Sequence, residues 1–417
     1  MFFVLHHFLR KTINRGNLVV LDPDGSEHRF GDGRGKEICV KLHDHTVGLA
    51  LALRPDPAFG EAYVEGRLTI EAGSLYDLME LVIPQLDYGF AYKWRTGAAL
   101  KQMLRRVARS NGLAGSRRNV AHHYDLSGKF YDLFLDTDRQ YSCAYFPAPQ
   151  TSLHQAQLAK KRRIAAKLNI EPGMRVLDIG CGWGGLALYL AEICGAKVTG
   201  ITLSVEQAEV ARQRVRARGL ESQVEILLLD YRQMEGRFDR IASVGMFEHV
   251  GPRQFGAYFN KVHNLLRRDG VALIHTIARP HGPYPTSTWI DRYIFPGGYL
   301  PALSEIQREI EVSGLYLCDV EVLRGHYART LRHWRNRFNG NRRKAAEIYD
   351  ERFCRIWDFY LAGSEIAFRL EYANVLQLQM ARHQAALPET RRYMRDNEER
   401  QRAVDSHSCR PKSVRAR

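Results

Sequence analysis

Residues 175–192 read RVLDIGCGWGGLALYLAE, a stretch that begins with the pattern of a buried strand and ends with the pattern of a helix. Four glycines stand in the join between the two, at Gly180, Gly182, Gly184 and Gly185. A backbone without side chains can approach a ligand closely and can adopt positive φ angles. A strand, the spacing Gly180-x-Gly182-x-x-Gly185 and a helix together satisfy the dinucleotide fingerprint, which alone is weak evidence for any particular nucleotide.

The chain beyond this turn keeps alternating between strand and helix patterns. Helical segments separate the predicted strands, which cover residues 174–180, 196–203, 224–231, 237–247 and 270–278. This order predicts an α/β fold with a mainly parallel, doubly wound, Rossmann-like sheet and helices on both faces. Such sheets bind ligands at the carboxyl ends of their strands.

Length and composition limit the class of protein. A chain of 417 residues exceeds one hydrophobic core, so we expect two domains. Seven cysteines, an odd number without CxxC spacing, argue against a disulfide framework and a zinc ribbon, and favour the cytoplasm. The histidines lack the spacing of a zinc site, so we assign no metal. No apolar run approaches the ~20 residues that span a bilayer.

The net charge of +15 favours a polyanionic partner, either nucleic acid or an anionic membrane surface. No recognised RNA-binding motif is present, which favours the membrane. The first residues, MFFVLHHFLRK, place their positive charges after a short apolar run, the reverse of a secretory signal. They are compatible with a peripheral amphipathic helix.

Shifts in pattern divide the chain into four expected parts. We expect a small N-terminal α+β domain over residues 1–110, with helix up to about Asn111, and a linker over 111–120. The main domain is expected over 121–389, and a basic, mobile tail without an apolar face over 390–417. Membrane docking and a homodimer contact are both reasonable roles for the small domain.

Two side-chain stripes in the second half of the chain have helical spacing, and both predict helices packed on the core. The first runs through Tyr327, Leu331, Trp334 and Phe338, and the second runs through Phe353, Trp357, Tyr360, Ser364 and Phe368. Before them, residues 278–289 are rich in proline and polar groups, which predicts an insertion or a lid.

The acidic residue before the glycine turn selects among nucleotide ligands. The carboxylate of Asp178 favours a cationic ligand and repels pyrophosphate. Position by position, LDIGCGWGG resembles motif I of the class I S-adenosylmethionine methyltransferases, and the third strand ends in Asp230-Tyr231, where that superfamily places an acid beside the adenine. The resemblance implies a donor site made of Tyr124, Tyr141, Ser142, Asp178, Gly180, Cys181, Gly182, Thr202, Ser204, Gln207, Asp230 and Tyr231.

The end of the second strand departs from that superfamily, which usually has an acid there for the ribose hydroxyls. Here the sequence is GITLSVEQ, so the available polar groups are Thr202, Ser204 and Gln207. Ser204 followed by Gln207 three residues later also fits a capping box at the start of the next helix. The two roles can coexist.

Several segments read together narrow the resemblance. They are HHYDLSGKFYDLFLD (122–136), YSCAYF (141–146), VGMFEHVG (244–251), LIHTI (273–277), RYIFPGGYLP (292–301), HYARTLRHWRNRF (326–338) and FYLAGSEIAFR (359–369). From about residue 120 to 385 the chain resembles the cyclopropane fatty acid synthase family. The N-terminal domain resembles that of the longer enzymes that act on phospholipids. The implied substrate is therefore an unsaturated phospholipid at the inner, anionic face of a membrane, reached by a peripheral enzyme.

The resemblance implies methyl transfer to a cis double bond, followed by proton loss and ring closure. In this family a bound bicarbonate is the base, and its ligands map onto Cys143, Glu248, His275, Tyr327 and the backbone amide of Ile277. Aromatic faces can stabilise the intermediate cation. Candidates in the matching segments are Tyr145, Phe146, Trp289 and Phe295.

Alternatives remain at this point. Relatives with the same motifs methylate small amines or leave a methyl branch on the acyl chain, and an RNA-binding methyltransferase would also be basic. An amine methyltransferase would not need bicarbonate, but a methyl-branching enzyme shares the first step. At Ser364 related enzymes carry a cysteine, and since a serine on an apolar helix face is a poor nucleophile without a base, we expect a structural position there.

Overall fold

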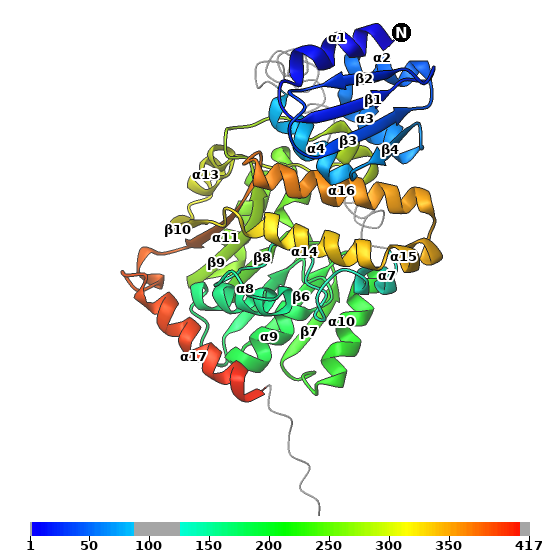
Figure 1. Cartoon of the computed structure of the whole chain (residues 1–417). Helices are drawn as coiled ribbons and strands as arrows, with labels where there is room; N and C mark the ends of the chain where they lie inside the picture. Colours follow the sequence, from blue (N-terminus) through cyan, green and yellow to red (C-terminus); the bar gives the residue numbers. More distant parts are fainter. Residues whose placement is uncertain (1, 87–125, 409–417) are drawn as a thin grey trace, which may run out of the picture.

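The computed structural model describes residues 2–86 and 126–408, with the side chains of 406–408 left aside. Within these ranges the chain forms a small N-terminal α+β part, drawn in blue at the top of Figure 1, and a larger α/β part below it. The expected linker at 111–120, the expected helix up to Asn111 and Tyr124 lie outside the described residues. No helix in the described ranges is long and apolar enough to span a bilayer.

The larger part is built on a seven-stranded sheet of order β10-β11-β9-β8-β5-β6-β7. Its strands are β5 (Arg175–Ile179), β6 (Lys197–Thr202), β7 (Val224–Leu228), β8 (Phe238–Val244), β9 (Leu266–Ala278), β10 (Tyr316–Val322) and β11 (Asn374–Ala381). The five from β5 to β9 run parallel, and β11 runs antiparallel to both β9 and β10. The predicted Rossmann-like α/β fold and its five predicted strands are therefore confirmed.

Helices cover both faces of this sheet because consecutive strand residues point to opposite sides. Val176 packs with one hydrophobic cluster and Leu177 with the other. The first face is covered by α8 (Leu153–Lys167), α9 (Gly185–Cys194) and α10 (Val205–Ala217), and the second by α11 (Phe255–Leu265) and α13 (Leu303–Val312). Both predicted faces are thus buried.

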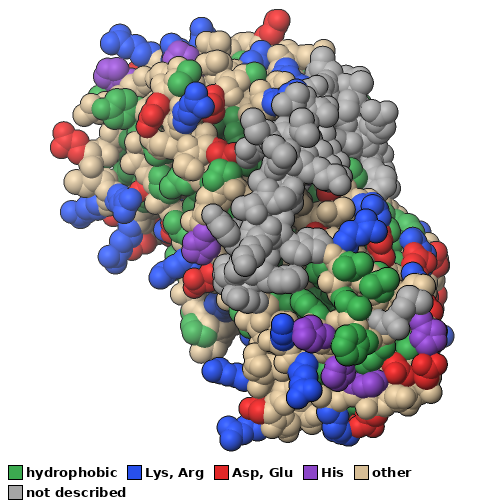
Figure 2. All heavy atoms as spheres, turned by 90° about the horizontal axis from the view of Figure 1, so that it is seen from above, with side chains coloured by type: hydrophobic (Ala, Val, Ile, Leu, Met, Phe, Trp, Pro, Cys, Tyr) green, Lys and Arg blue, Asp and Glu red, His purple; other side chains and the backbone are tan. Residues whose placement is uncertain are grey.

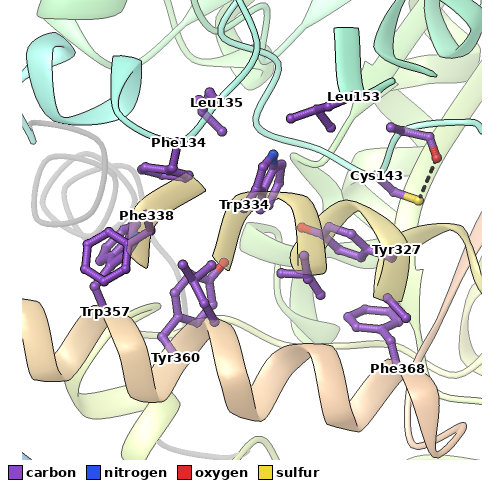
Figure 3. Packing of buried hydrophobic residues seen from close by; sticks show 14 of the residues in the cluster. Phe134, Leu135, Cys143, Leu153, Tyr327, Trp334, Phe338, Trp357, Tyr360 and Phe368 are labelled. Atoms are coloured by element: carbon purple, nitrogen blue, oxygen red, sulfur yellow. Dashed lines mark hydrogen bonds between the residues drawn. The ribbon is translucent and has the colours of Figure 1, made fainter. Parts of the chain in front are cut away.

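A third layer packs across the carboxyl ends of the strands. It contains α7 (Gly128–Asp132), α12 (Thr288–Tyr293), α14 (His326–Gly340), α15 (Arg342–Ile348) and α16 (Glu351–Arg369). The two predicted stripes lie on α14 and α16, whose long axes run side by side in Figure 1. Figure 3 shows the aromatic side chains that fill the space between these two helices, including Tyr327, Tyr360 and Phe368.

The N-terminal part has its own sheet, of order β2-β1-β3-β4, and its own core. Its elements are α1 (Phe2–Thr12), β1 (Asn17–Leu21), β2 (Glu27–Phe30), β3 (Glu37–Leu42), α2 (His45–Leu53), α3 (Pro55–Val64), β4 (Leu68–Ala72) and α4 (Leu75–Val82). Apolar side chains of α4 pack against α16, and the hydroxyl of Tyr63 donates to Asp358 at 2.8 Å. This part therefore rests directly on the helix layer above the large sheet.

The expectation of a mobile tail from residue 390 is wrong for most of its length. Residues Arg392–Ser408 form helix α17, which lies along α8 at the lower edge of Figure 1. Asn397, Gln401 and Asp405 are all buried. Because this buried face is polar, the sequence of the helix has no apolar stripe from which it could be predicted. Asp405 accepts from Arg162 of α8, and Glu398 pairs with Arg163 at 2.7 Å.

Candidate active site

The glycine turn between β5 and α9 has the geometry that only glycine adopts without strain. Gly180 has φ +81° and Gly184, at the N-cap of α9, has φ +78°. A Cβ on Gly180 would lie 2.8 Å from the Cβ of Met246. The bare backbone therefore allows the end of β8 to approach the turn and leaves the start of α9 open toward a cavity.

This cavity, the donor cavity, has a volume of about 150 Å³ and lies at the carboxyl ends of β5 to β8. The predicted residues that line it are Tyr141, Ser142, Asp178, Gly180, Cys181, Gly182, Thr202, Gln207, Asp230 and Tyr231. Ser204 does not line it, because its Oγ lies at the N-terminus of α10 and accepts from the Gln207 amide at 3.3 Å. Ten of the residues predicted for the donor site thus line this cavity. Ser204 instead caps helix α10.

Asp178 gives the donor cavity a negative group that is ready for a ligand. Its side chain is 1% exposed, and its Oδ2 has no hydrogen-bond partner in the structure. Burial raises the pKa of this carboxyl to about 7, partly offset by the positive charge of Lys160. A buried carboxylate without a partner is costly, so this site fits a cationic ligand group.

The ends of β6 and β7 supply neutral and paired groups. The Thr202 hydroxyl donates to Oε1 of Gln207 at 3.0 Å, so a hydroxyl and an amide stand where related enzymes carry an acid. Asp230 precedes a short 3₁₀ turn (Tyr231–Gln233), and its Oδ2 lies 2.7 Å from the guanidinium of Arg232. The carboxylate expected beside the adenine is therefore held in place by a neighbouring cation.

A second cavity, the acyl cavity, has a volume of about 310 Å³ and shares four lining residues with the donor cavity: Tyr141, Ser142, Gly245 and His249. The rest of its wall is mostly aromatic and aliphatic and comes from α12, α14, α16 and the end of β9. All five residues that the resemblance assigned to the base line it: Cys143, Glu248, His275, Ile277 and Tyr327. The structure brings the whole set to one chamber.

Glu248 is the acidic member of this set and sits on a 3₁₀ turn, Phe247–His249. Its Oε1 accepts from the backbone amide of Ile277 at 2.7 Å, and its Oε2 is buried without a partner. Burial raises the pKa of Glu248 to about 7. The Ile277 amide that the resemblance assigned to bicarbonate thus holds the carboxyl itself.

His275 presents a donor to the same chamber. The Gln377 amide nitrogen lies 3.2 Å from Nδ1 of His275, so in this orientation Nδ1 accepts and Nε2 carries the hydrogen. Nε2 is buried and without a partner, and burial lowers the pKa of the ring to about 3. A neutral donor and an unpartnered carboxyl oxygen from two residues that line one cavity fit a small protonated oxyanion such as bicarbonate.

Cys143 and Tyr327 complete the set from different elements (Figure 3). The Cys143 thiol donates to the carbonyl of Ala144 at 3.4 Å, and burial raises the pKa of that thiol, which keeps it uncharged. Tyr327 begins the buried stripe of α14 and packs on Phe368 of α16 with ring centroids 4.6 Å apart.

Two of the four aromatic candidates line the acyl cavity, namely Trp289 and Phe295. The other two do not. Tyr145 stacks on His326 with ring centroids 4.7 Å apart, and Phe146 stacks on His333 with ring centroids 5.6 Å apart. Both histidines belong to α14, so these two rings pack on that helix. The sequence could not separate them, because it does not show which of these rings lies at the cavity wall.

Ser364 lies on α16 and lines the acyl cavity among small and aromatic side chains. Lys160 and His249 are among the lining residues that sequence reasoning missed. Lys160 stands in the run AKKRR, which is typical of a solvated helix face, so no signal distinguished it. His249 stands next to Glu248 in a matching segment and could have been found.

Comparison with known proteins gives a consistent family. A family model described as mycolic acid cyclopropane synthetase matches residues 113–378. The chain is 46% identical over 267 residues to a probable fatty acid methyltransferase of Pseudomonas putida, covering 62% of this chain and 68% of that one. It is 42% identical over 260 residues to the cyclopropane-fatty-acyl-phospholipid synthase of Escherichia coli K12, covering 62% and 66%.

One relative matches nearly the whole chain. The tuberculostearic acid methyltransferase UfaA1 of Mycobacterium tuberculosis is 36% identical over 408 residues, which cover 91% of each chain. Among solved structures, the mycolic acid cyclopropane synthase CmaA1 complexed with SAH and CTAB has a TM-score of 0.61 and 36% identity, covering 63% of this chain and 97% of that one.

Proposed function

The chain belongs to the mycolic acid cyclopropane synthetase family of S-adenosylmethionine-dependent methyltransferases, and from this premise we propose that it converts the cis double bond of an unsaturated phospholipid acyl chain into a cyclopropane ring. The donor supplies an electrophilic methyl group on a sulfonium. The alkene electrons form the new carbon–carbon bond while the sulfonium–methyl bond breaks and S-adenosylhomocysteine leaves. Loss of a proton from the transferred methyl then closes the ring. The net change is the addition of one methylene.

The junction of the two cavities is the observation that carries this proposal. A cavity whose wall includes the charged groups of Asp178, Lys160 and Asp230 meets a largely apolar cavity at Tyr141, Ser142, Gly245 and His249. An alkene is a poor nucleophile, so its reaction depends on holding it in line with the methyl group in a dry site. A chamber of about 310 Å³ with a mostly aromatic and aliphatic wall suits an acyl chain.

The aromatic wall suits the cation that follows methyl transfer. Trp289, Phe295 and Tyr360 line the acyl cavity, and ring faces stabilise a positive carbon without bonding to it. The hydroxyls of Tyr360 and Tyr141 lie 3.0 Å apart and are hydrogen-bonded to each other. The wall therefore favours survival of the cation until its proton leaves.

We assign the proton acceptor to a bicarbonate held by this chain. Glu248 through Oε2, His275 through Nε2, Tyr327 and Cys143 would hold it, and it would supply the base for the departing proton. Glu248 shares a proton with an anionic neighbour most easily when its own pKa is raised to about 7, as burial makes it. Its Oε2 can then accept the hydroxyl hydrogen of the bicarbonate.

A second product is favoured by one observation. The relative that matches 91% of both chains is a tuberculostearic acid methyltransferase, which is named for a methyl-branched product. The same cation would give a methylene branch if a hydride shifted to it from the methylated carbon and a proton then left the methyl group. A reductant that supplied a hydride, with a proton, would convert this methylene branch to a methyl branch. Ring closure requires the base to face the new methyl group.

The test is a reaction of the purified protein with S-adenosylmethionine and vesicles of an unsaturated phospholipid. Mass spectrometry should show one added CH₂, and proton NMR should show the high-field signals of a cyclopropane. A methylene branch has the same mass but shows vinylidene signals, and a methyl branch is heavier by two hydrogens. Either of these would replace the ring proposal, and no gain in mass would overturn both.

We also propose that the protein meets its substrate at an anionic membrane surface as a peripheral protein of the cytoplasm. Helix α1 exposes Phe3 at 78% and Val4 at 42%, and its last turn carries Arg10 and Lys11. Figure 2, which views the molecule from the end that carries this domain, shows Lys, Arg and His side chains beside hydrophobic ones on the visible face. Apolar and basic groups together suit a surface of anionic lipid.

A further inference from the structure

Lys160 is a buried cation in the wall of the donor cavity. It lies on α8, behind the loop that carries Gln140 and Ser142, and its side chain is 1% exposed. Its Nζ donates to Oε1 of Gln140 at 2.6 Å and to Oγ of Ser142 at 2.8 Å. Both acceptors also line the donor cavity. An ammonium has three N–H donors, so one remains after these two bonds.

The charge of Lys160 has no counter-ion in contact with it. Both hydrogen-bond acceptors are neutral, and within the described ranges no carboxylate lies within 4.0 Å of its Nζ. Its neighbour Lys161, by contrast, pairs with Asp138 at 2.6 Å. A buried ammonium without an ion pair is costly, so a bound ligand that supplied the opposite charge would stabilise it.

Asp178 lines the same cavity with the opposite charge, and it too is buried without an ion-pair partner. Its Oδ2 is buried without a partner, and no cation of the described residues lies within 4.0 Å of it. The two groups are near enough for the charge of Lys160 to act on the carboxyl, but they do not form an ion pair. The donor cavity thus holds two separated, unpaired charges of opposite sign.

The methionine portion of the donor carries a matching pair of charges, an ammonium and a carboxylate on one carbon. We propose that Lys160 is the counter-ion of the donor's carboxylate, while Asp178 faces its ammonium, so that the two buried charges orient the amino acid end of the donor. This inference rests on the donor named above and not on the acyl chemistry. It therefore stands or falls separately from the cyclopropane product.

A purely structural role for Lys160 predicts a different outcome. Lys160 also fixes Gln140 and Ser142, so its removal can loosen the loop that walls both cavities. A loosened loop would weaken every nucleoside ligand alike. A lost counter-ion weakens only ligands that carry the carboxylate, and this difference separates the two roles.

The experiment measures binding by calorimetry with two probes, S-adenosylhomocysteine and its decarboxylated form. The native protein should bind the carboxylate form about 10-fold to 100-fold more tightly, as expected for a charge-assisted hydrogen bond in a buried site. Lys160→Met should lose most of that preference and bind the decarboxylated probe as the native protein does. Lys160→Arg, which keeps the charge, should retain part of the preference.

Lys197→Met is the matched control, since Lys197 is exposed at the first residue of β6, at the opposite edge of the sheet. It should leave both affinities unchanged. Equal weakening of the two probes by Lys160→Met would overturn the proposal in favour of a structural role. Lack of preference in the native protein would overturn it without any variant, even if Lys160→Met failed to fold.

Discussion

At the scale of single residues, Glu248 carries the clearest functional expectation. It lines the acyl cavity but not the donor cavity, and its free Oε2 is the group assigned to the base. Glu248→Gln keeps the shape but replaces an acceptor that can share a proton. We expect turnover to fall about 100-fold, the usual scale of lost acid–base assistance, with unchanged affinity for S-adenosylhomocysteine. Unchanged turnover in a product assay would remove Glu248 from the mechanism.

The two charges in the donor cavity predict how donor affinity varies with pH. Burial raises the pKa of Asp178 to about 7, and the carboxyl must be ionised to hold an ammonium, so affinity should rise as pH increases toward 7. Burial lowers the pKa of Lys160 to about 8, with Asp136 acting in the opposite direction and neighbouring Lys161 in the same one. Because the ammonium of Lys160 is needed for the carboxylate, affinity should fall above 8.

Calorimetric titration with S-adenosylhomocysteine across this range therefore should give a maximum between about pH 7 and about pH 8. The decarboxylated probe lacks the group that needs Lys160. Its affinity should therefore rise toward pH 7 but should not fall above pH 8 through loss of the Lys160 charge. Affinity that is constant from acid to alkaline pH would contradict the assignment of both buried charges.

Ser364 offers a test of a residue that differs from its relatives. It lines the acyl cavity from α16, and a serine needs an adjacent base to act as a nucleophile. Ser364→Cys changes the volume little, so we expect turnover and product to stay within about twofold of the native protein. A large gain in turnover, or a switch from branch to ring, would show that this position alters the activity.

Sequence reasoning reached the residues of the site unevenly, for physical reasons. Asp178 and the glycines were found because a strand, a turn and a helix in series leave a pattern in consecutive residues. Cys143 and Tyr327 were found through resemblance, since they are brought together only by packing. Lys160 was missed because the sequence does not show whether a lysine side chain is buried or solvated.

At the scale of elements, α12 depends on a residue from the N-terminal part. Oδ2 of Asp56 accepts from the amide of Thr288 at 2.8 Å, and Oδ1 accepts from the amide of Trp289 at 3.0 Å. Trp289 then packs on Phe359 with centroids 4.4 Å apart and lines the acyl cavity. One carboxylate thus fixes the start of a helix that forms part of the acyl wall.

Asp56→Ala should loosen this wall without touching the donor cavity. Loss of a helix cap costs about 1 kcal/mol, so we expect kcat/KM for the lipid to fall about fivefold, with unchanged binding of S-adenosylhomocysteine. Asp44→Ala is the control, because Asp44 caps α2 within the N-terminal part and does not contact α12. Equal loss of lipid turnover in both variants would point to a general loss of stability.

The elements that were predicted individually have a hydrophobic period, and the helix that was mistaken for a tail does not. The five parallel strands and helices α14 and α16 carry apolar faces that local patterns reveal. Helix α17 buries Asn397, Gln401 and Asp405 instead, and Asp405 accepts from Arg162 of α8, so its sequence resembles a solvated tail. Its structure depends on partners more than 200 residues away, namely a separation of 243 from Arg162 to Asp405.

At the scale of the whole molecule, composition indicated a basic protein of two parts but not how the parts meet. Tyr76 of the N-terminal part donates to Glu365, a fully buried carboxyl on α16 that also pairs with Arg335 at 2.8 Å. The N-terminal part therefore packs on the same helix that lines the acyl cavity. Its deletion would uncover the apolar side chains of α16, so loss of activity in a truncated protein would not identify a docking role.

Point substitutions on α1 test membrane docking without that ambiguity. The double variant Phe3→Ser and Val4→Ser removes two exposed apolar side chains from a helix that also carries Arg10 and Lys11. Burial of such groups in an interface supplies at least about 1 kcal/mol, so binding to vesicles with anionic lipid should fall at least about fivefold, with turnover on those vesicles falling in parallel. Val312→Ser, at a side chain 71% exposed on α13, is the matched control.

Sedimentation of vesicles at two salt concentrations measures both the apolar and the ionic contribution, because salt screens only the second. If the α1 variant sediments and turns over like the native protein, the surface that meets the lipid lies elsewhere.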